Sequence, residues 1–444
     1  MTQTDSIDAV DMARRIRDDI YEETKHLSDE QLLEYYRTRA GTAPTQPSGS
    51  SGNRTAAENT ALHATVERIE SDREQTPARP AEAPTKQLYN FNPGPAILPR
   101  PVLEQVQAEL LDYHGTGLSI LEASHRGREY EEINGQAEER LKRLLGVGDD
   151  YRVLFVQGGA SQQFGMVPMN FLTEGAVADY IVTGAWAEKA LDEARKIGRT
   201  HVAASTKNSG YRGVPGPEQI DLSHDPAYVH ICSNETISGT QWQRYPDVGG
   251  RRLVADMSSD ILSRPVDGSQ FALMYAGTQK NLGCAGVTAV VTRTDWLEQA
   301  PTTLPAMLRY ATFAKNDSLY NTPPVFAVYV MNLTLRWVES LGLEAIEQRN
   351  GQKAAAIYDA VDNSGGYYCG HAAPDSRSLM NVTFRLPNEE HEKWFVAAAA
   401  AAGFVGLKGH RSVGGIRVSL YNAMEVDGPK QLAAFMAEFA RTNG

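Results

Sequence analysis

The sequence predicts an α/β protein with a mainly parallel sheet and a smaller α+β domain at its C-terminal end. Short apolar segments of strand length alternate with helical stretches, and beyond Asn350 the pattern changes to helices with short strands. Buried strands alternating with helices are typical of a parallel sheet covered on both faces. We expect a large domain over 88–345, beginning with an arm over 88–100, and a small domain over 346–444.

The large domain is expected to begin with two helices. The first opens at Pro101, and the second runs from Glu129 to Leu145 and ends at Gly146, a residue type that favours helix C-termini. Both carry apolar residues at helical spacing: Val102, Val106 and Leu110, then Ile133, Ala137, Leu141 and Leu144. Apolar strands then alternate with helices, and we expect strands at Val153–Val156, Tyr180–Val182, Tyr228–Ile231, Arg252–Ala255, Phe271–Tyr275 and Val287–Val291.

The first 87 residues differ from the rest in composition. Residues 1–40 predict two short helices, the second opened by a capping box of Ser28 and Gln31. Residues 41–87 are rich in Thr, Ala, Pro, Ser, Gly and Glu, which predicts a flexible linker. Two hypotheses stay open for the front helices: a module that docks a partner protein or the catalytic domain, or a dispensable extension.

The overall charge and the cysteines exclude several classes of protein. With 444 residues, a formal net charge of -12 and a pI near 5.4, the chain is unsuited to nucleic acid or an anionic membrane as its main partner. Cys232, Cys284 and Cys369 are scattered and form no CxxC, so we expect neither a disulfide framework nor a metal site. The acidic N-terminus has no signal-peptide core and no long apolar run occurs, so we expect a cytoplasmic protein.

Several chemically suggestive residues follow the predicted strands. Gly-Gly-Ala-Ser, ending at Ala160 and Ser161, opens a helix, and such a turn can hold an anion. Asp256 closes one strand and Lys280 lies between apolar segments. Taken singly, these residues have ordinary explanations as a turn, a cap and a solvated lysine. Together they occur where an open α/β sheet binds its ligand, beyond the carboxyl ends of the strands.

Two further residues complete a constellation suited to one cofactor. Trp186 follows the strand DYIVTG and can stack on an aromatic ring, and Thr236 in SNETISG can donate a hydrogen bond to a ring hydroxyl oxygen. Pyridoxal phosphate requires a phosphate cradle, a carboxylate for its ring nitrogen and an amine for a Schiff base. The order of anion loop, aromatic ring, Asp256 and Lys280 fits these requirements.

Ten segments carry a resemblance to a known family. They are YNFNPGPAILP, SHRG, GGASQQF, GAWAEKA, NETISG, ADMSSDILSRPVD, YAGTQKN, NTPPVFA, LKGHRSVGGIR and SLYNAM. In order and spacing they resemble the phosphoserine aminotransferase family of class V pyridoxal-phosphate enzymes, over about residues 88–444. The resemblance implies a fold-type I transferase with a seven-stranded type of sheet.

The resemblance also implies roles for the residues at matching positions. Lys280 would carry the cofactor as a Schiff base, Asp256 would pair with its ring nitrogen and Trp186 would stack on the ring. The implied phosphate contacts are Ala160, Ser161 and Gln279, together with Asn321 and Thr322 from a second subunit. A homodimer with shared active sites is therefore the expected active form.

The substrates of the family are glutamate with 2-oxoglutarate, and phosphoserine with 3-phosphohydroxypyruvate, exchanged by ping-pong transamination in serine biosynthesis. All are anionic, and the matching cationic positions are His125 and Arg126 in SHRG, His410 and Arg411 in KGHR, and Arg417 in GGIR. A planar guanidinium binds a carboxylate in a bidentate manner, which suits Arg417 to the α-carboxylate.

Other functions of the same fold stay open at this point. A second phosphorylated substrate of the family, 4-phosphohydroxythreonine in vitamin B6 biosynthesis, is one alternative. A serine–glyoxylate transaminase or a cysteine desulfurase is another. A desulfurase requires a reactive cysteine, for which Cys369, with His371 nearby in the sequence, is the candidate.

Overall fold

The computed structural model describes residues 88–411 and 413–444, all within one compact unit of the chain. The expected front helices, with the capping box of Ser28 and Gln31, and the expected linker over 41–87 lie outside the described residues. Within the described ranges, no helix combines the length and the apolar character needed to cross a membrane.

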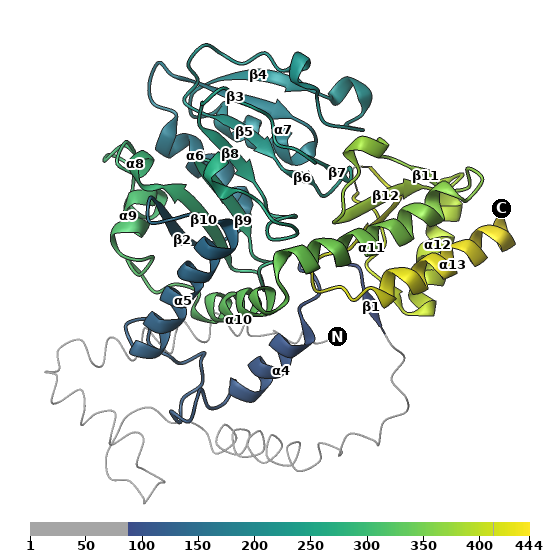
Figure 1. Ribbon diagram of the computed structural model, residues 1–444, viewed down its shortest axis with the longest axis horizontal. Helices are drawn as coiled ribbons and strands as arrows, with labels where there is room; N and C mark the ends of the chain where they lie inside the picture. Colours follow the sequence, from purple (N-terminus) through teal and green to yellow (C-terminus); the bar gives the residue numbers. More distant parts are fainter. Residues whose placement is uncertain (1–87, 412) are drawn as a thin grey trace, which may run out of the picture. The chain divides into compact units, whose positions relative to one another are not determined.

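A seven-stranded sheet forms the centre of the larger part of the fold (Figure 1). From edge to edge its strands are β2 (Tyr151–Gln157), β10 (Val287–Arg293), β9 (Leu273–Gly277), β8 (Leu253–Asp256), β5 (Val229–Cys232), β3 (Val177–Val182) and β4 (Arg199–Ser205). β10 runs antiparallel to β2 and β9, and the other neighbouring pairs are parallel. The predicted α/β class with a mainly parallel sheet is confirmed.

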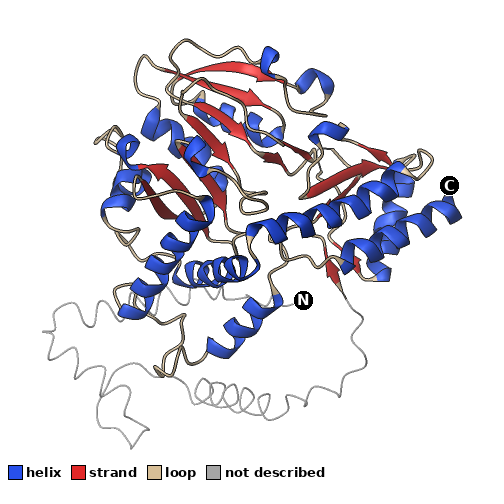
Figure 2. Ribbon diagram, viewed as in Figure 1, coloured by secondary structure: helices blue, strands red, loops and turns tan. Residues whose placement is uncertain are grey.

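Helices cover both faces of this sheet, because successive side chains of a strand point to opposite faces (Figure 2). In β2, Val153 and Phe155 belong to one buried core, and Leu154 and Val156 belong to another. The first core includes residues of α4 (Arg100–Glu109), α5 (Arg128–Leu145) and α10 (Val325–Leu341); the second includes α6 (Ala160–Phe171), α7 (Ala185–Ala194), α8 (Thr294–Leu297) and α9 (Tyr310–Lys315).

Strand β4 is the member of this sheet that the sequence pattern does not predict. Its segment, RTHVAAS, mixes charged, polar and small residues instead of an apolar run. It lies at the edge of the sheet, beside β3 only, and its Val202 is 37% exposed. Because an edge strand is less completely covered than an inner strand, it carries a weaker apolar signal.

The predicted helix boundaries hold closely. α4 has its proline in the first turn, and α5 begins one residue before the predicted Glu129. α5 ends at Gly146, where φ is 65° and the N–H donates to the carbonyls of Arg143 and Lys142. A left-handed glycine closing a helix in this way is a common C-cap.

The C-terminal part has its own sheet and core. The three-stranded antiparallel sheet has the order β11 (Cys369–Gly370), β12 (Asn381–Arg385), β14 (Ile416–Ser419). The helices α11 (Leu343–Asp362), α12 (Glu389–Ala402) and α13 (Asp427–Asn443) pack with it around Phe384, Phe395 and Val418 (Figure 1). These separate cores support, as a proposal, the division into residues 88–345 and 346–444.

Two further strand pairs are short, and one of them joins distant parts of the chain. β1 (Tyr89–Asn90) pairs in parallel with β13 (Phe404–Val405), so the arm after residue 88 is attached to the C-terminal part. β6 (Asn234–Glu235) and β7 (Thr240–Gln241) form a small antiparallel pair after β5. Short 3-10 helices complete the described elements: Lys207–Ser209, Pro217–Gln219, Gly268–Gln270, Ala306–Leu308 and Pro374–Ser376.

Candidate active site

One cavity, of about 100 Å³, gathers most of the predicted cofactor residues. It lies beyond the carboxyl ends of β8 and β9, the position expected for a ligand in an open α/β sheet. The predicted residues that line it are Ala160, Ser161, Trp186, Thr236, Asp256, Gln279 and Lys280. They come from loops, helix starts and the end of a strand, spread over 120 positions of the sequence, counted from 160 to 280.

Lys280 lies just after β9, in the turn that leads toward β10. Its Nζ donates a hydrogen bond of 2.6 Å to Oγ1 of Thr236. The N-terminal arm packs against its stem, since a Cβ added at Gly94 would lie 3.4 Å from Cγ of Lys280. The arm is also bonded to this turn, because Ala96 N–H donates to the carbonyl of Gln279. The amine is therefore held by a hydroxyl while the arm covers its stem.

Asp256 ends β8 and is 5% exposed. Its Oδ1 accepts two hydrogen bonds from Ser258, one of 2.9 Å from the backbone N–H and one of 2.6 Å from the hydroxyl. Burial raises the pKa of this carboxyl, while the bonds from Ser258 and the nearby charge of Lys280 act in the opposite direction. Both bonds end on the same oxygen, so the second oxygen can serve a cationic partner in the cavity.

The start of α6 forms another wall of the cavity. Gly159 precedes the helix, and Ala160 and Ser161 are its first residues. The first N–H groups of a helix have no partner within it and form the positive end of its dipole. The end of β9 comes close to them, because a Cβ at Gly277 would lie 3.4 Å from the nitrogen of Ala160. An anionic group such as a phosphate is favoured here.

Trp186 lies in the first turn of α7 and its ring faces two lysines. Nζ of Lys189 is 4.2 Å from the ring centroid, and Nζ of Lys280 is 5.9 Å from it. The ring also contacts Phe164, with 6.4 Å between centroids. The indole nitrogen is buried and makes no hydrogen bond to any described residue. Trp186 therefore offers a flat aromatic surface on the wall of the cavity.

A second, smaller cavity of about 20 Å³ contains the predicted cations His410 and Arg417. Arg417 comes from β14 and is 7% exposed, and its Nη1 donates to the carbonyl of Thr236 at 3.4 Å. Burial lowers the pKa of this guanidinium. Burial also lowers the pKa of His410, together with the charges of Arg417, Lys189 and Arg411. Thr236 thus links the two cavities, because it lines the first and bonds to Arg417.

Five predicted residues do not line either cavity within a single chain. Nε2 of Gln157, the last residue of β2, donates to Oδ1 of Asn321 at 2.9 Å and to the carbonyl of Thr322 at 3.4 Å. Arg126 and Arg411 are exposed and His125 is half-buried, and all three are in loops. None of the five lines either cavity.

Sequence reasoning missed several residues of the site. Ser258 holds Asp256 and also accepts a hydrogen bond of 3.1 Å from Gly277 N–H, which joins the ends of β8 and β9. Asn234, Ser259 and Cys232 line the main cavity, and His371 and Arg385 line the smaller one. The segments ADMSS and SNETISG contain Ser258, Ser259 and Asn234, so membership of these motifs is the signal that could have found them.

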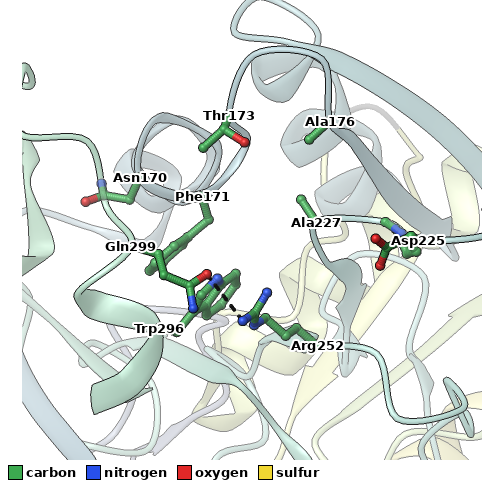
Figure 3. Close-up of a pocket in the computed structure, with 10 residues that line it drawn as sticks. Asn170, Phe171, Thr173, Ala176, Asp225, Ala227, Arg252, Trp296 and Gln299 are labelled. Carbon is green, nitrogen blue, oxygen red and sulfur yellow. Dashed lines mark hydrogen bonds between the residues drawn. The ribbon is translucent and has the colours of Figure 1, made fainter.

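Another hollow lies at the opposite, amino-terminal edge of the sheet (Figure 3). It has about 190 Å³ and includes Arg252, whose Nη2 donates to Oε1 of Gln299 at 3.3 Å, and Asp225 on the far side. No lysine lines it, and the stacked rings of Phe171 and Trp296 form its floor. The Lys280 cavity is therefore the candidate site.

The fold and this site define the class of protein. Residues 88–432 match the family model of class-V aminotransferases, and the chain belongs to this family. Its relatives include phosphoserine aminotransferases. The protein of that name from Herpetosiphon aurantiacus is 57% identical over 358 residues, which are 80% of this chain and 99% of the relative. The one from Geobacillus kaustophilus is 58% identical, covering 80% of this chain and 99% of the relative.

Solved structures agree with the sequence comparison. Phosphoserine aminotransferase from Bacillus circulans subsp. alkalophilus matches with a TM-score of 0.80 and 55% identity, over 81% of this chain and all of that chain. The pyridoxal-phosphate-bound enzyme from Trichomonas vaginalis matches with a TM-score of 0.75 and 37% identity, over 79% of this chain and 99% of that chain. The family and these structures imply pyridoxal phosphate as the cofactor.

Proposed function

We propose that the protein is a phosphoserine:2-oxoglutarate aminotransferase of serine biosynthesis. It exchanges an amino group between glutamate and 3-phosphohydroxypyruvate, which gives 2-oxoglutarate and phosphoserine. The observation that carries this proposal is the convergence of Lys280, Asp256, Trp186 and Thr236 on one cavity. Relatives of that name, matched over nearly their whole length, support the choice of substrates.

The residues of the cavity fit pyridoxal phosphate. Asp256 is a buried carboxylate with an oxygen to spare for a ring nitrogen, and Trp186 supplies a flat surface for the ring. The phosphate would bind at the start of α6, where Ala160 and Ser161 lie, with Gln279 beside them. Lys280 would hold the aldehyde carbon, and Thr236 would bond to the ring hydroxyl oxygen. When bound, the cofactor supplies an electron sink for negative charge on the substrate carbon.

The chain itself supplies the proton transfer and the orientation of the substrate. Once the amino group of the substrate has displaced it from the cofactor, Nζ of Lys280 would be a free amine and would act as the base that removes the proton from the substrate α-carbon. Oγ1 of Thr236, 2.6 Å away, keeps this amine within the cavity. Arg417 binds the α-carboxylate through its planar guanidinium, which lies next to the same threonine. These positions orient the carbon–hydrogen bond toward the amine.

The second anionic group of each substrate requires further cations. We assign it to His410 and Arg411, with His125 and Arg126. His410 lines the cavity of Arg417, while Arg126 and Arg411 are exposed in a single chain. Their exposure fits a site that is completed by another molecule.

We infer a homodimer in which Asn321 and Thr322 reach the phosphate of the partner's cofactor. Neither residue lines the cavity of its own chain, and both accept hydrogen bonds from Gln157. Light scattering on the purified protein measures the mass directly. In a mixing test, Asn321→Ala homodimers are expected to be weakly active and Lys280→Ala homodimers inactive, and mixed dimers regain activity only if sites are shared between subunits.

The positions and the environments of Cys369 and Cys232 do not favour a cysteine desulfurase. Cys369 is exposed in β11 and lines neither cavity. Cys232 lines the main cavity, but its thiol donates to the carbonyl of Asn234 at 3.4 Å and burial raises its pKa. A nucleophilic cysteine needs the opposite, a lowered pKa.

The decisive experiment is an assay of amino transfer. Purified protein is mixed with phosphoserine and 2-oxoglutarate, and glutamate is measured. Glutamate formation that depends on both substrates is the expected result, and its absence would refute the proposal. Replacing phosphoserine by 4-phosphohydroxythreonine in a parallel assay ranks the two phosphorylated substrates. Replacing it by serine tests whether the phosphate is required.

A further inference from the structure

Glu235 is a buried carboxylate next to the candidate site that sequence reasoning does not single out. It belongs to β6 and is 1% exposed. Its Oε2 accepts a hydrogen bond of 3.0 Å from Trp186 N–H, and its Oε1 accepts one of 2.9 Å from Ala187 N–H. The carboxylate therefore satisfies two of the free N–H groups at the start of α7, where a negative charge is favoured.

Gly184 provides the space that this contact needs. It is the N-cap residue of α7, and it has no side chain with which to cap the helix itself. A Cβ at this position would lie 2.3 Å from Cδ of Glu235 and 2.5 Å from its Oε2. The backbone at Gly184 is extended, with a φ of 173°, so the requirement for glycine here is one of space. A distant carboxylate thus replaces the usual capping side chain.

The position of the Trp186 ring is linked to the contact between Glu235 and the start of α7. Trp186 is the second residue of α7, and its backbone N–H is one of the two groups that Glu235 holds. No hydrogen bond to a described residue fixes its indole nitrogen. The ring is thus located by the start of the helix and by packing contacts such as the one with Phe164.

The residue after Glu235 contacts the other two functional groups of the site. Thr236 accepts the hydrogen bond of Lys280 at 2.6 Å through its side chain, and that of Arg417 at 3.4 Å through its carbonyl. Through these contacts, the dipeptide Glu235–Thr236 connects the start of α7, which carries the Trp186 ring, with the amine of Lys280 and the guanidinium of Arg417.

We propose that Glu235 is a positioning residue, whose carboxylate holds the start of α7 and thereby places the Trp186 ring against the cofactor. This inference rests on the proposed function, because it assigns Trp186 to the ring of pyridoxal phosphate. Glu235 does not touch the reacting atoms and acts through Trp186.

Two variants disrupt the contact between the Glu235 carboxylate and the start of α7 in different ways. Glu235→Gln keeps the shape, but its amide nitrogen is a donor that cannot accept one of the two backbone N–H groups. Gly184→Ala keeps the carboxylate and displaces it. Glu193→Gln is the matched control, since Glu193 is on the same helix, with a side chain that is 44% exposed and paired with Lys196 at 2.7 Å.

Full-length holoenzymes of all four proteins are compared by three measurements. These are the visible circular dichroism per bound cofactor, the rate of pyridoxal phosphate release on dilution, and the urea midpoint of unfolding. For Glu235→Gln and Gly184→Ala we expect a weaker dichroic band and release about tenfold faster, the effect of one lost hydrogen bond to a charged group. The control is expected to match the wild type.

Unchanged dichroism and release in both variants would overturn the proposal, and so would a lower unfolding midpoint without any change at the cofactor. The same experiment separates this inference from the proposed function. If the wild type binds pyridoxal phosphate but does not transfer the amino group of phosphoserine, the proposed substrate is wrong. The dichroism and the release rates still decide the role of Glu235 in that case.

Discussion

The amine of Lys280 donates a hydrogen bond of 2.6 Å to the hydroxyl of Thr236, which lies 44 positions earlier in the chain. The carbonyl of the same threonine accepts from Arg417 at 3.4 Å. One residue of the turn between β6 and β7 thus sets the distance between the proposed base and the proposed carboxylate-binding cation. In the proposed function, a substrate bound by Arg417 would therefore lie close to Lys280.

Removing the amine should abolish the reaction. Lys280→Ala lacks both the base and the covalent attachment of the cofactor, and loss of general-base catalysis alone is worth about 10²–10⁴-fold. We expect no detectable glutamate formation and no visible absorbance band of lysine-bound cofactor. Lys196→Ala, in the turn after α7 and with a side chain that is 64% exposed, is the control. A yellow and active Lys280→Ala enzyme would show that the assignment is wrong.

Neutralising Asp256 should lower the activity of the enzyme but raise the stability of its cofactor-free form. Asp256→Asn can still accept both hydrogen bonds from Ser258, but it cannot stabilise a protonated ring nitrogen. Breaking a buried charge pair costs about 3–5 kcal/mol, so kcat should fall by at least about 10²-fold. Burial raises the pKa of this carboxyl, which means that folding disfavours its charge. The cofactor-free variant should therefore melt above the cofactor-free wild type, and a lower melting temperature would contradict this reasoning.

Replacing Arg417, the proposed binding residue for the α-carboxylate, should weaken the binding of both substrates. Arg417→Lys keeps the charge but loses the bidentate geometry, which is worth about 1.5–3 kcal/mol for hydrogen bonds to a charged group. We expect KM to rise about tenfold or more for glutamate and for phosphoserine alike, since both carry an α-carboxylate. Arg349→Lys, a change at the ion pair with Glu425, is the control. A rise for one substrate only would place Arg417 at the second anionic group.

The pH dependence of stability should report on Glu235. Burial raises its pKa to about 7 from the usual 4.5, with a further contribution from the charge of Asp256. An acid whose pKa is raised by folding stabilises the folded state fully below pH 4.5, and this contribution is lost as the pH rises through 7. The loss amounts to about 3 kcal/mol, at about 1.4 kcal/mol per pKa unit.

Thermal unfolding of the cofactor-free wild type and of Glu235→Gln between these two pH values tests this relation. The wild type should lose stability relative to the variant as the pH rises, because the amide does not titrate. Parallel curves for the two proteins would mean that Glu235 titrates near its usual pKa.

Deleting residues 1–86 should leave the chemistry unchanged. The family match begins at residue 88, and the relatives are covered over almost their full length without the preceding segment. We expect the truncated and full-length enzymes to have the same kcat, KM and mass in solution. A change in any of these would favour a regulatory role for the segment, and a pull-down with residues 1–86 as bait tests for a partner protein.

Local patterns were sufficient for most of the architecture. The strand around Val153 and the helix ending at Gly146 follow from side-chain periodicity and from glycine's backbone freedom, which act over a few residues. β4 was not predicted, because this edge strand, with its exposed Val202, has no continuous apolar run. Asp256 and Lys280 could be predicted as site residues because Asp256 ends a strand and Lys280 follows one, and an open α/β sheet binds its ligand beyond the carboxyl ends of its strands.

By itself, the sequence determined the α/β fold class and predicted the site residues, which it assigned to one edge of the sheet. Only the tertiary structure decided which side chains touch: that Thr236 joins Lys280 to Arg417, and that Glu235 caps a helix 49 positions earlier. Hydrogen bonds and burial depend on distances between segments far apart in the chain. No periodicity or local propensity of the sequence encodes those distances directly, because they are set by how the sheet and its covering helices pack.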